Sequence, residues 1–293
     1  MKYDTSSQEG LNALVVEGGA MRGIFAAGVL DAFLKENFNP FDMCIGVSAG
    51  ATNLSGYLAK MYKRNCKIIM NYSTRQEFID IKRFLKGGDL LDLDWLWDVS
   101  LTEIGLNIGE IINYQGNYLV GVTNAQTGKP EYFQPDRENL NHILKASSAI
   151  PILYKEVIQI NGTDYVDGGV ADPIPVKEAY KRNAKNILVI RSRPFNYKMK
   201  NRRSKALSKL VLKEYPNLID TVYKRAKIYN ETIDFIRNSP SDINILEVNP
   251  PDDFKTTRLT TDKNILKEDY NKGFEIGIDT IKNWNNLISS YKI

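Results

Sequence analysis

The chain has 293 residues, of which 43% are hydrophobic and 25% charged, and its net charge is only +4, a composition typical of globular proteins. No apolar run is long enough to cross a bilayer and no signal-peptide core is present, so we expect a cytoplasmic protein. Two cysteines and one histidine do not suit a disulfide framework or a zinc site, so we expect reduced thiols and no metal.

The first half of the chain alternates short apolar runs with helical patterns. Strands are predicted at 11–16 and 41–47, and helices at 24–34 and 49–62. This order is typical of parallel strands covered by helices. The stretch 86–112 has an irregular pattern in which Trp95 and Trp97 occur among leucines. We expect these tryptophans to pack on the core beneath a long loop. The alternative is that they form part of a lid or contact a lipid interface.

The second half contains two hairpin patterns and several helices. The hairpins are expected at 118–133 and 155–166, helices at 137–146, 201–238 and 263–290, and strands at 186–190 and 243–248. Asp172, followed by proline, is expected to cap a further helix. We therefore predict one α/β domain over 1–293, a three-layer α/β/α fold with a mostly parallel sheet, comprising a motif core at about 11–192 and a helical C-terminal extension at about 201–293.

At 46–50 a predicted strand passes into a helix through a Gly-x-Ser-x-Gly sequence. This pattern places a serine hydroxyl on a sharp turn above a sheet. Gly46 and Gly50 leave room for that turn, and the start of the helix favours negative charge developing at Ser48. We interpret Ser48 as a nucleophile rather than as a buried helix cap.

A glycine-rich segment at 18–23 lies between the first predicted strand and the first helix. A dinucleotide-binding loop would need glycine where Ala20 stands. Small residues also allow backbone N–H groups to approach an oxyanion, so we favour Gly18, Gly19 and Ala20 as an oxyanion loop over close helix packing alone. Consecutive strand-loop-helix units bring such loops to one sheet edge, so the donors would face Ser48.

Asp167 ends the second arm of the 155–166 hairpin and precedes two glycines. A free aspartate, with a pKa of about 3.9, is a weak base, but burial raises that pKa and proximity to Ser48 compensates for weak basicity. An Asp-Gly pair is also a common turn. Asp164, near the hairpin turn, and Asp172 are rival candidates for the base.

The single histidine, His142, falls within a predicted helix and precedes Asp167 in the sequence. The order of a hydrolase triad is serine, acid and then histidine, so His142 is misplaced for that role. We interpret it as a surface residue. If Ser48 is a nucleophile, a group other than an imidazole has to accept its proton.

Together these segments resemble the patatin-like phospholipase family, in which a glycine-rich oxyanion loop, a G-x-S-x-G elbow and an Asp-Gly-Ala or Asp-Gly-Gly box follow one another. The matching residues here are Gly18 to Gly23 with Arg22, then Gly46 to Gly50, then Asp167, Gly168 and Gly169. The segment 146–151 also resembles a box of the family. Ala20 departs from the usual glycine, which would strain the loop if its φ were positive.

The resemblance implies a patatin-like fold and a serine acyl hydrolase acting on lipid or related carboxylic esters through a Ser-Asp dyad. Ser48 would attack the carbonyl while Asp167 takes its proton, and the Gly18 to Ala20 amides would stabilise the oxyanion. Water activated by Asp167 would then release the acid. No metal or organic cofactor is implied. The acyl chain, the head group and the oligomeric state stay open.

Positive charge is concentrated at 181–213, where no acidic residue occurs. This stretch is either a solvated surface or a patch that contacts an anionic membrane surface. Our alternative hypothesis is a non-catalytic protein that binds anionic lipid or nucleic acid there, but this leaves the glycine-rich segments unexplained, and we do not expect nucleic acid as a partner. Arg22 would either hold its loop or meet an anionic head group.

Overall fold

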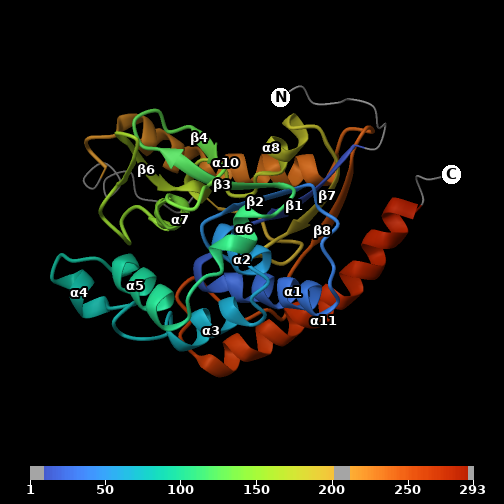
Figure 1. Ribbon diagram of the computed structural model, residues 1–293. Coiled ribbons are helices and arrows are strands. Elements are labelled where there is room, and N and C mark those ends of the chain that lie inside the picture. Colours follow the sequence, from blue (N-terminus) through green and yellow to red (C-terminus); the bar gives the residue numbers. More distant parts are fainter. Residues whose placement is uncertain (1–9, 201–211, 290–293) are drawn as a thin grey trace.

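The computed structural model describes residues 10–200 and 212–289, and it shows a mixed sheet with helices on both faces (Figure 1). The strands are β1 (Leu11–Val16), β2 (Met43–Val47), β3 (Asn117–Asn124), β4 (Pro130–Phe133), β5 (Ile158–Ile160), β6 (Thr163–Asp167), β7 (Ala184–Ile190) and β8 (Asn244–Val248). They form an eight-stranded sheet in the order β5-β6-β3-β2-β1-β7-β8, with β4 also paired to β3.

The centre of the sheet is parallel and one edge is antiparallel. Strands β3, β2, β1, β7 and β8 run parallel to one another. Strands β4 and β6 pair antiparallel with β3, and β5 pairs antiparallel with β6. The carboxyl ends of β1 and β2 therefore lie at the same edge, where the glycine-rich segments follow them. This is the edge at which parallel α/β sheets build binding sites.

The helices differ widely in length. They are α1 (Gly23–Lys35), α2 (Ala49–Leu58), α3 (Arg64–Asn71), α4 (Ile81–Leu85), α5 (Leu93–Glu103), α6 (Ile108–Ile112), α7 (Leu140–Ser148), α8 (Val176–Lys181), α10 (Pro216–Arg237) and α11 (Lys263–Ser289), with 3-10 turns at Ala20–Arg22 and Gly168–Val170. Among the helices that the structure describes, none has the length and apolarity that crossing a membrane requires.

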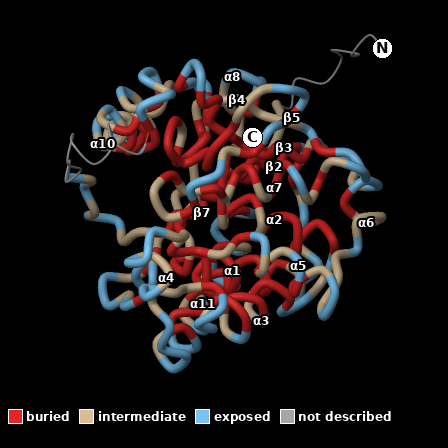
Figure 2. Tube along the Cα trace, turned by 90° about the vertical axis from the view of Figure 1, so that its left-hand side faces the viewer, coloured by how far each residue is buried: buried red, intermediate tan, exposed pale blue. Residues whose placement is uncertain are grey.

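Alternate residues of the central strands pack against different helical layers. Leu14 and Val16 belong to the core that contains α1, α2 and α11, whereas Ala13 and Val15 pack with α8 and α10. Burial on both faces explains why these strands appear as continuous apolar runs in the sequence. Figure 2 shows the buried segments gathered around β2, β3, α1 and α2, with exposed segments at the periphery. The predicted three-layer α/β/α fold with C-terminal helices is confirmed.

The long C-terminal helix α11 packs along α1 (Figure 1). Their backbones come so close that a Cβ atom on Gly273 would lie 2.3 Å from the carbonyl oxygen of Phe25. A Cβ atom on Gly28 would likewise lie 2.2 Å from the carbonyl oxygen of Tyr270. Glycine is thus required sterically at this crossing, and the C-terminal region is built into the main core.

Two local predictions are wrong. The stretch 86–112 is not an irregular loop, because it contains α5 and α6. The expected packing of Trp95 and Trp97 on the core is confirmed, but both residues lie on helix α5. Asp172 does not cap a helix, because α8 begins only after Pro175. A residue before proline avoids the helical region, so the second proline delays the helix start. The Asp172 carboxylate instead accepts a hydrogen bond from the Tyr132 hydroxyl at 2.5 Å.

Candidate active site

Ser48 occupies a strained turn between β2 and α2. Its φ of 54° and ψ of −131° lie where residues with a side chain rarely occur. A Cβ atom on Gly50 would lie 2.3 Å from the carbonyl oxygen of Val16, and one on Gly46 would lie 2.6 Å from the amide nitrogen of Ala51. A side chain at either glycine would therefore clash with backbone, so the turn depends on both.

Hydrogen bonds from a distant helix hold this turn in place. The Ser48 amide donates to Ser147 Oγ at 2.8 Å, and the Ser147 hydroxyl donates to the carbonyl oxygen of Gly121 at 2.6 Å. Ser147 lies on α7 and is fully buried. It belongs to the 146–151 segment, whose resemblance to a family box was the only signal in the sequence for it. Ser147 thus couples the Ser48 turn to the adjacent strand β3.

Asp167, the last residue of β6, lies in the same cavity as Ser48. Its Oδ1 accepts the Gly169 amide at 2.8 Å, and its Oδ2 is buried without a fully formed hydrogen bond in the described part of the chain. Burial raises the pKa of Asp167, and hydrogen bonding with the Ser48 side chain and the charge of Arg225 oppose this rise. The two groups are close, in the loose geometry that catalytic pairs often show before substrate binds.

The two glycines after Asp167 allow the chain to turn tightly under the carboxylate. A Cβ atom on Gly168 would lie only 2.1 Å from the carbonyl oxygen of Gly121. Thr123 supports the same turn, since its hydroxyl donates to the carbonyl oxygen of Asp167 at 2.9 Å. Strand β3 therefore contacts both the Ser48 turn, through Ser147, and the Asp167 turn.

The predicted oxyanion loop borders this cavity. Gly18, Gly19 and Ala20 line it together with Ser48 and Asp167. A Cβ atom on Gly18 would lie 3.0 Å from the Ser48 Cβ, so the loop packs directly on the turn. Within 10–200 and 212–289, no acceptor in the chain is bonded to the amides of these three loop residues. Such free N–H groups are what an oxyanion site requires.

Ala20 has a φ of 50°, in the left-handed region. The strain anticipated from the missing glycine is therefore present, at a cost of about 1–2 kcal/mol. Behind it, the Arg22 Nε donates to the carbonyl oxygen of Ser192 at 3.2 Å, which anchors the loop. A Cβ atom on Gly23 would lie 3.1 Å from the Ala49 Cβ, so a larger residue there would push α1 away from α2.

A buried ion-pair network beneath the loop was not predicted. Arg191 is fully buried, and its Nε donates to Glu17 Oε2 at 2.9 Å. It also pairs with Glu247 and donates to the Tyr229 hydroxyl at 2.7 Å. Glu17 in turn accepts the amide of Ser192 at 2.9 Å. Glu17 directly precedes Gly18, so this network fixes where the predicted oxyanion loop begins.

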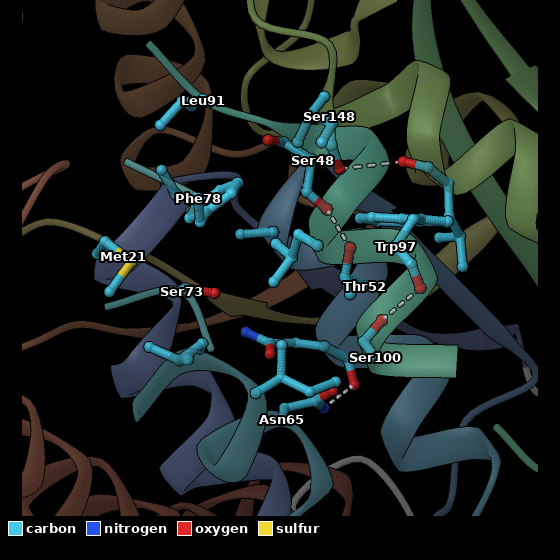
Figure 3. A pocket seen from close by; sticks show the side chains of 18 of the residues that line it. Met21, Ser48, Thr52, Asn65, Ser73, Phe78, Leu91, Trp97, Ser100 and Ser148 are labelled. Carbon is cyan, nitrogen blue, oxygen red and sulfur yellow. Dashed lines mark hydrogen bonds between the residues drawn. The ribbon is translucent and has the colours of Figure 1, made fainter. Parts of the chain in front are cut away.

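A second, apolar pocket opens beside Ser48 (Figure 3). Ser48 and Thr52, a residue of α2, lie near Trp97 and Ser100 of α5 in this view. Other apolar lining residues include Ile68, Phe78, Leu91, Leu96 and Leu144. Helix α5, which the sequence pattern did not reveal, therefore supplies one wall of the pocket. The apolar lining of this pocket suits an acyl chain or another long apolar group.

Other candidate residues lie away from Ser48. His142 is exposed on α7, where its Nε2 lies 2.6 Å from the carbonyl oxygen of Gln159, as expected of a surface residue. Asp164 accepts hydrogen bonds from Gln126 and Tyr215 and does not line the cavity. Cys44 and Cys66 are free thiols. Across the described ranges, no three His, Cys, Asp or Glu side chains cluster as a metal site would need.

Comparison with known proteins places this geometry in a family. The family model described as patatin-like phospholipase matches residues 14–180, and a domain of unknown function, DUF6363, matches residues 215–289. The uncharacterized protein YjjU of Escherichia coli K12 is 36% identical over 270 residues, covering 91% of this chain and 76% of YjjU.

Two further proteins are more distant. The probable lipid hydrolase 463L of Invertebrate iridescent virus 6 is 28% identical over 193 residues, covering 59% of this chain and 65% of the viral protein. The crystal structure of VipD from Legionella pneumophila superposes with a TM-score of 0.54 at 13% identity, covering 95% of this chain and 68% of VipD, a likeness of fold alone. On the match over 14–180, with the fold and the ordered motifs described above, the chain belongs to the patatin-like phospholipase family.

Proposed function

We propose that this protein is a serine acyl hydrolase that cleaves carboxylic esters of lipids, with Ser48 as nucleophile and Asp167 as base. The observation that carries the proposal is the shared cavity of the two residues. Ser48 stands on a strained turn, and the carboxylate beside it has a raised pKa because it is buried. A carboxylate with a raised pKa is a better proton acceptor at neutral pH than a free aspartate.

In the first step, Ser48 Oγ forms a bond to the ester carbonyl carbon as its proton moves to Asp167. The carbonyl oxygen becomes an oxyanion, which the free amides at Gly18, Gly19 and Ala20 stabilise. The C–O bond to the alcohol then breaks, and Asp167 returns the proton to the departing alkoxide. The product is a free alcohol and an acyl-Ser48 ester.

In the second step, Asp167 takes a proton from a water molecule that attacks the acyl carbon. The tetrahedral intermediate uses the same amides, and its collapse breaks the bond to Ser48 Oγ, which recovers the proton from Asp167. The apolar pocket beside Ser48 would hold the acyl chain through both steps.

The non-catalytic alternative, based on the basic stretch 181–213, has less support. Several of its cations are neutralised within the protein: Arg182 pairs with Glu178 at 2.8 Å, and Arg191 is buried against Glu17. Residues 201–211 of this stretch lie outside the described part of the chain. Contact with an anionic membrane surface and a cytoplasmic location stay predictions, which vesicle sedimentation and cell fractionation would check.

The test is hydrolysis of short p-nitrophenyl esters by the variants Ser48→Ala and Asp167→Asn. We expect each variant to lose nearly all activity but to stay folded, as shown by a cooperative melting transition. Matched controls are Ser241→Ala, at an exposed serine, and Asp164→Asn, at the rival aspartate. Full activity in Ser48→Ala would refute the proposal. Loss in Ser48→Ala with none in Asp167→Asn would refute the dyad.

A further inference from the structure

Four arginines surround the cavity that holds Ser48 and Asp167. Arg22, Arg225 and Arg258 line it directly. Arg193 is close enough to act electrostatically on both Arg22 and Arg258. Arg22 belongs to the oxyanion loop, Arg225 to α10, and Arg258 to the segment between β8 and α11.

These arginines have no carboxylate partner in the part of the chain that the structure describes. Among the ion pairs within 4.0 Å in the described ranges, none includes any of the four. The Arg22 Nε donates to a neutral carbonyl oxygen, and so does the Arg225 Nε, to Gly169 at 2.6 Å. Arg22 is only 3% exposed, and its Nη1 is buried without a hydrogen-bond partner in the described chain.

The local charges do not balance. Glu17 is already paired with Arg191, which leaves Asp167 as the carboxylate whose charge favours the cationic form of Arg258. Burial, followed by repulsion from Arg193, lowers the pKa of Arg22 to about 9. Guanidinium groups that are buried without a counter-charge destabilise a protein, so the cavity is built for an anion to enter.

The arginine cavity and the apolar pocket meet at Ser48. Ala20, Ile150 and Arg258 also line both spaces. A substrate could therefore place an acyl chain on one side of the Ser48 hydroxyl and an anionic group on the other, with the ester bond between them. Guanidinium forks that converge from several directions match the oxygens of phosphate better than they match a single carboxylate.

We propose that Arg22, Arg225 and Arg258 form a subsite for a phosphate group carried close to the scissile ester. This inference rests on the proposed function. Arg225 and Arg258 fall within residues 215–289, the region matched by the domain of unknown function. The C-terminal region thus contributes specificity: it adds to the hydrolase core the cations that select phosphate-bearing esters over neutral ones.

The test compares 1-oleoylglycerol with 1-oleoylglycerol 3-phosphate in mixed micelles of a nonionic detergent. The two substrates share an acyl ester and differ in the phosphate. We expect the wild type to prefer the phosphate ester in kcat/KM, and Arg225→Gln and Arg258→Gln each to reduce that preference about tenfold, the effect of one charged hydrogen bond. Arg182→Gln, which removes a charge just after helix α8 at a residue that does not line the cavity, is the matched control and should keep the preference.

Inorganic phosphate provides a second readout that does not require a phosphate-ester substrate. It should compete with the neutral ester in the wild type, and less so in Arg258→Lys, which keeps the charge but loses the fork. Inhibition by inorganic phosphate without a preference for the phosphate ester would overturn a subsite for phosphate esters and would instead indicate an anion site whose ligand is free phosphate. A wild type with neither preference nor inhibition would overturn the subsite.

Two controls separate this inference from its alternatives. If Arg258 only positions and tunes Asp167, then Arg258→Gln will slow both substrates equally and shift the pH profile, which overturns the subsite. If a fluorophosphonate labels Ser48 and the wild type cleaves both esters equally, the subsite fails while the proposed function stands. If the wild type cleaves neither ester and Ser48 is not labelled, the proposed function fails.

Discussion

Replacing Ser147 with alanine removes the side chain that links α7, β3 and the Ser48 turn. Two buried groups lose their partners: the Ser48 amide, 2.8 Å from Ser147 Oγ, and the carbonyl oxygen of Gly121, 2.6 Å from it. Each buried group left without a partner costs about 1–3 kcal/mol, so we expect Ser147→Ala to lower the free energy of unfolding by about 2–6 kcal/mol.

The same substitution should slow catalysis, because the strained backbone at Ser48 loses a bond that holds it. We expect kcat to fall more than tenfold, the order expected for a misplaced nucleophile. KM should change little, because Ser147 lines neither cavity. Urea unfolding followed by circular dichroism gives the stability, and ester hydrolysis gives kcat and KM.

A matched stability control is Ser148→Ala, since the Ser148 hydroxyl donates to the carbonyl oxygen of Leu144 one turn back, within the same helix. We expect it to change the free energy of unfolding by less than about 1 kcal/mol. If Ser147→Ala loses no more stability than Ser148→Ala and retains the wild-type kcat, the reasoning about the Ser48 turn is refuted.

Three further predictions concern the groups around Ser48. Because burial raises the pKa of Asp167, ionisation of this residue destabilises the fold as pH rises. Asp167→Asn should therefore have a melting temperature at or above that of the wild type at neutral pH. The difference in melting temperature should shrink on acidification to about pH 4. A lower melting temperature at neutral pH would contradict this. Glu17→Gln leaves Arg191 buried with a weaker partner and should cost about 3–5 kcal/mol in urea unfolding; a loss below about 1 kcal/mol would count against the buried pair. Gly50→Ala should destabilise by about 3 kcal/mol or more, since its Cβ would lie 2.3 Å from the Val16 carbonyl oxygen, and wild-type stability would show that the turn can yield.

The sequence predicted best what local pattern determines. The apolar runs at β1 and β2 and the helical spacing after each predicted the parallel sheet, and the glycines around Ser48 predicted its sharp turn. The steric crowding at Gly46 and Gly50 shows why those glycines are informative, since a side chain at either would meet backbone. The catalytic roles of Ser48 and Asp167 stay proposals.

The sequence predicted less where distant segments meet. Ser147 contacts Ser48 across 99 positions, and the Arg191–Glu17 contact spans 174 positions. Periodicity reports which residues face a core, not which polar side chains pair across it. The sign of φ at Ala20 was likewise left open by the sequence, and the structure gives it as positive.

The organisation of the C-terminal region was predicted only in outline. Its helical content was expected, but its packing on α1 and its arginines beside Asp167 were not. A single domain over 1–293 stays a prediction. Limited proteolysis should find no stable fragment that ends between β7 and α10 if that prediction is right.

The most direct test of the central claim is peptide mass spectrometry after treatment with a fluorophosphonate. We expect one phosphonyl adduct, on Ser48, formed quickly by the wild type and far more slowly by Asp167→Asn. An adduct on another serine, or equal labelling rates in the two proteins, would contradict the claim that Asp167 activates Ser48.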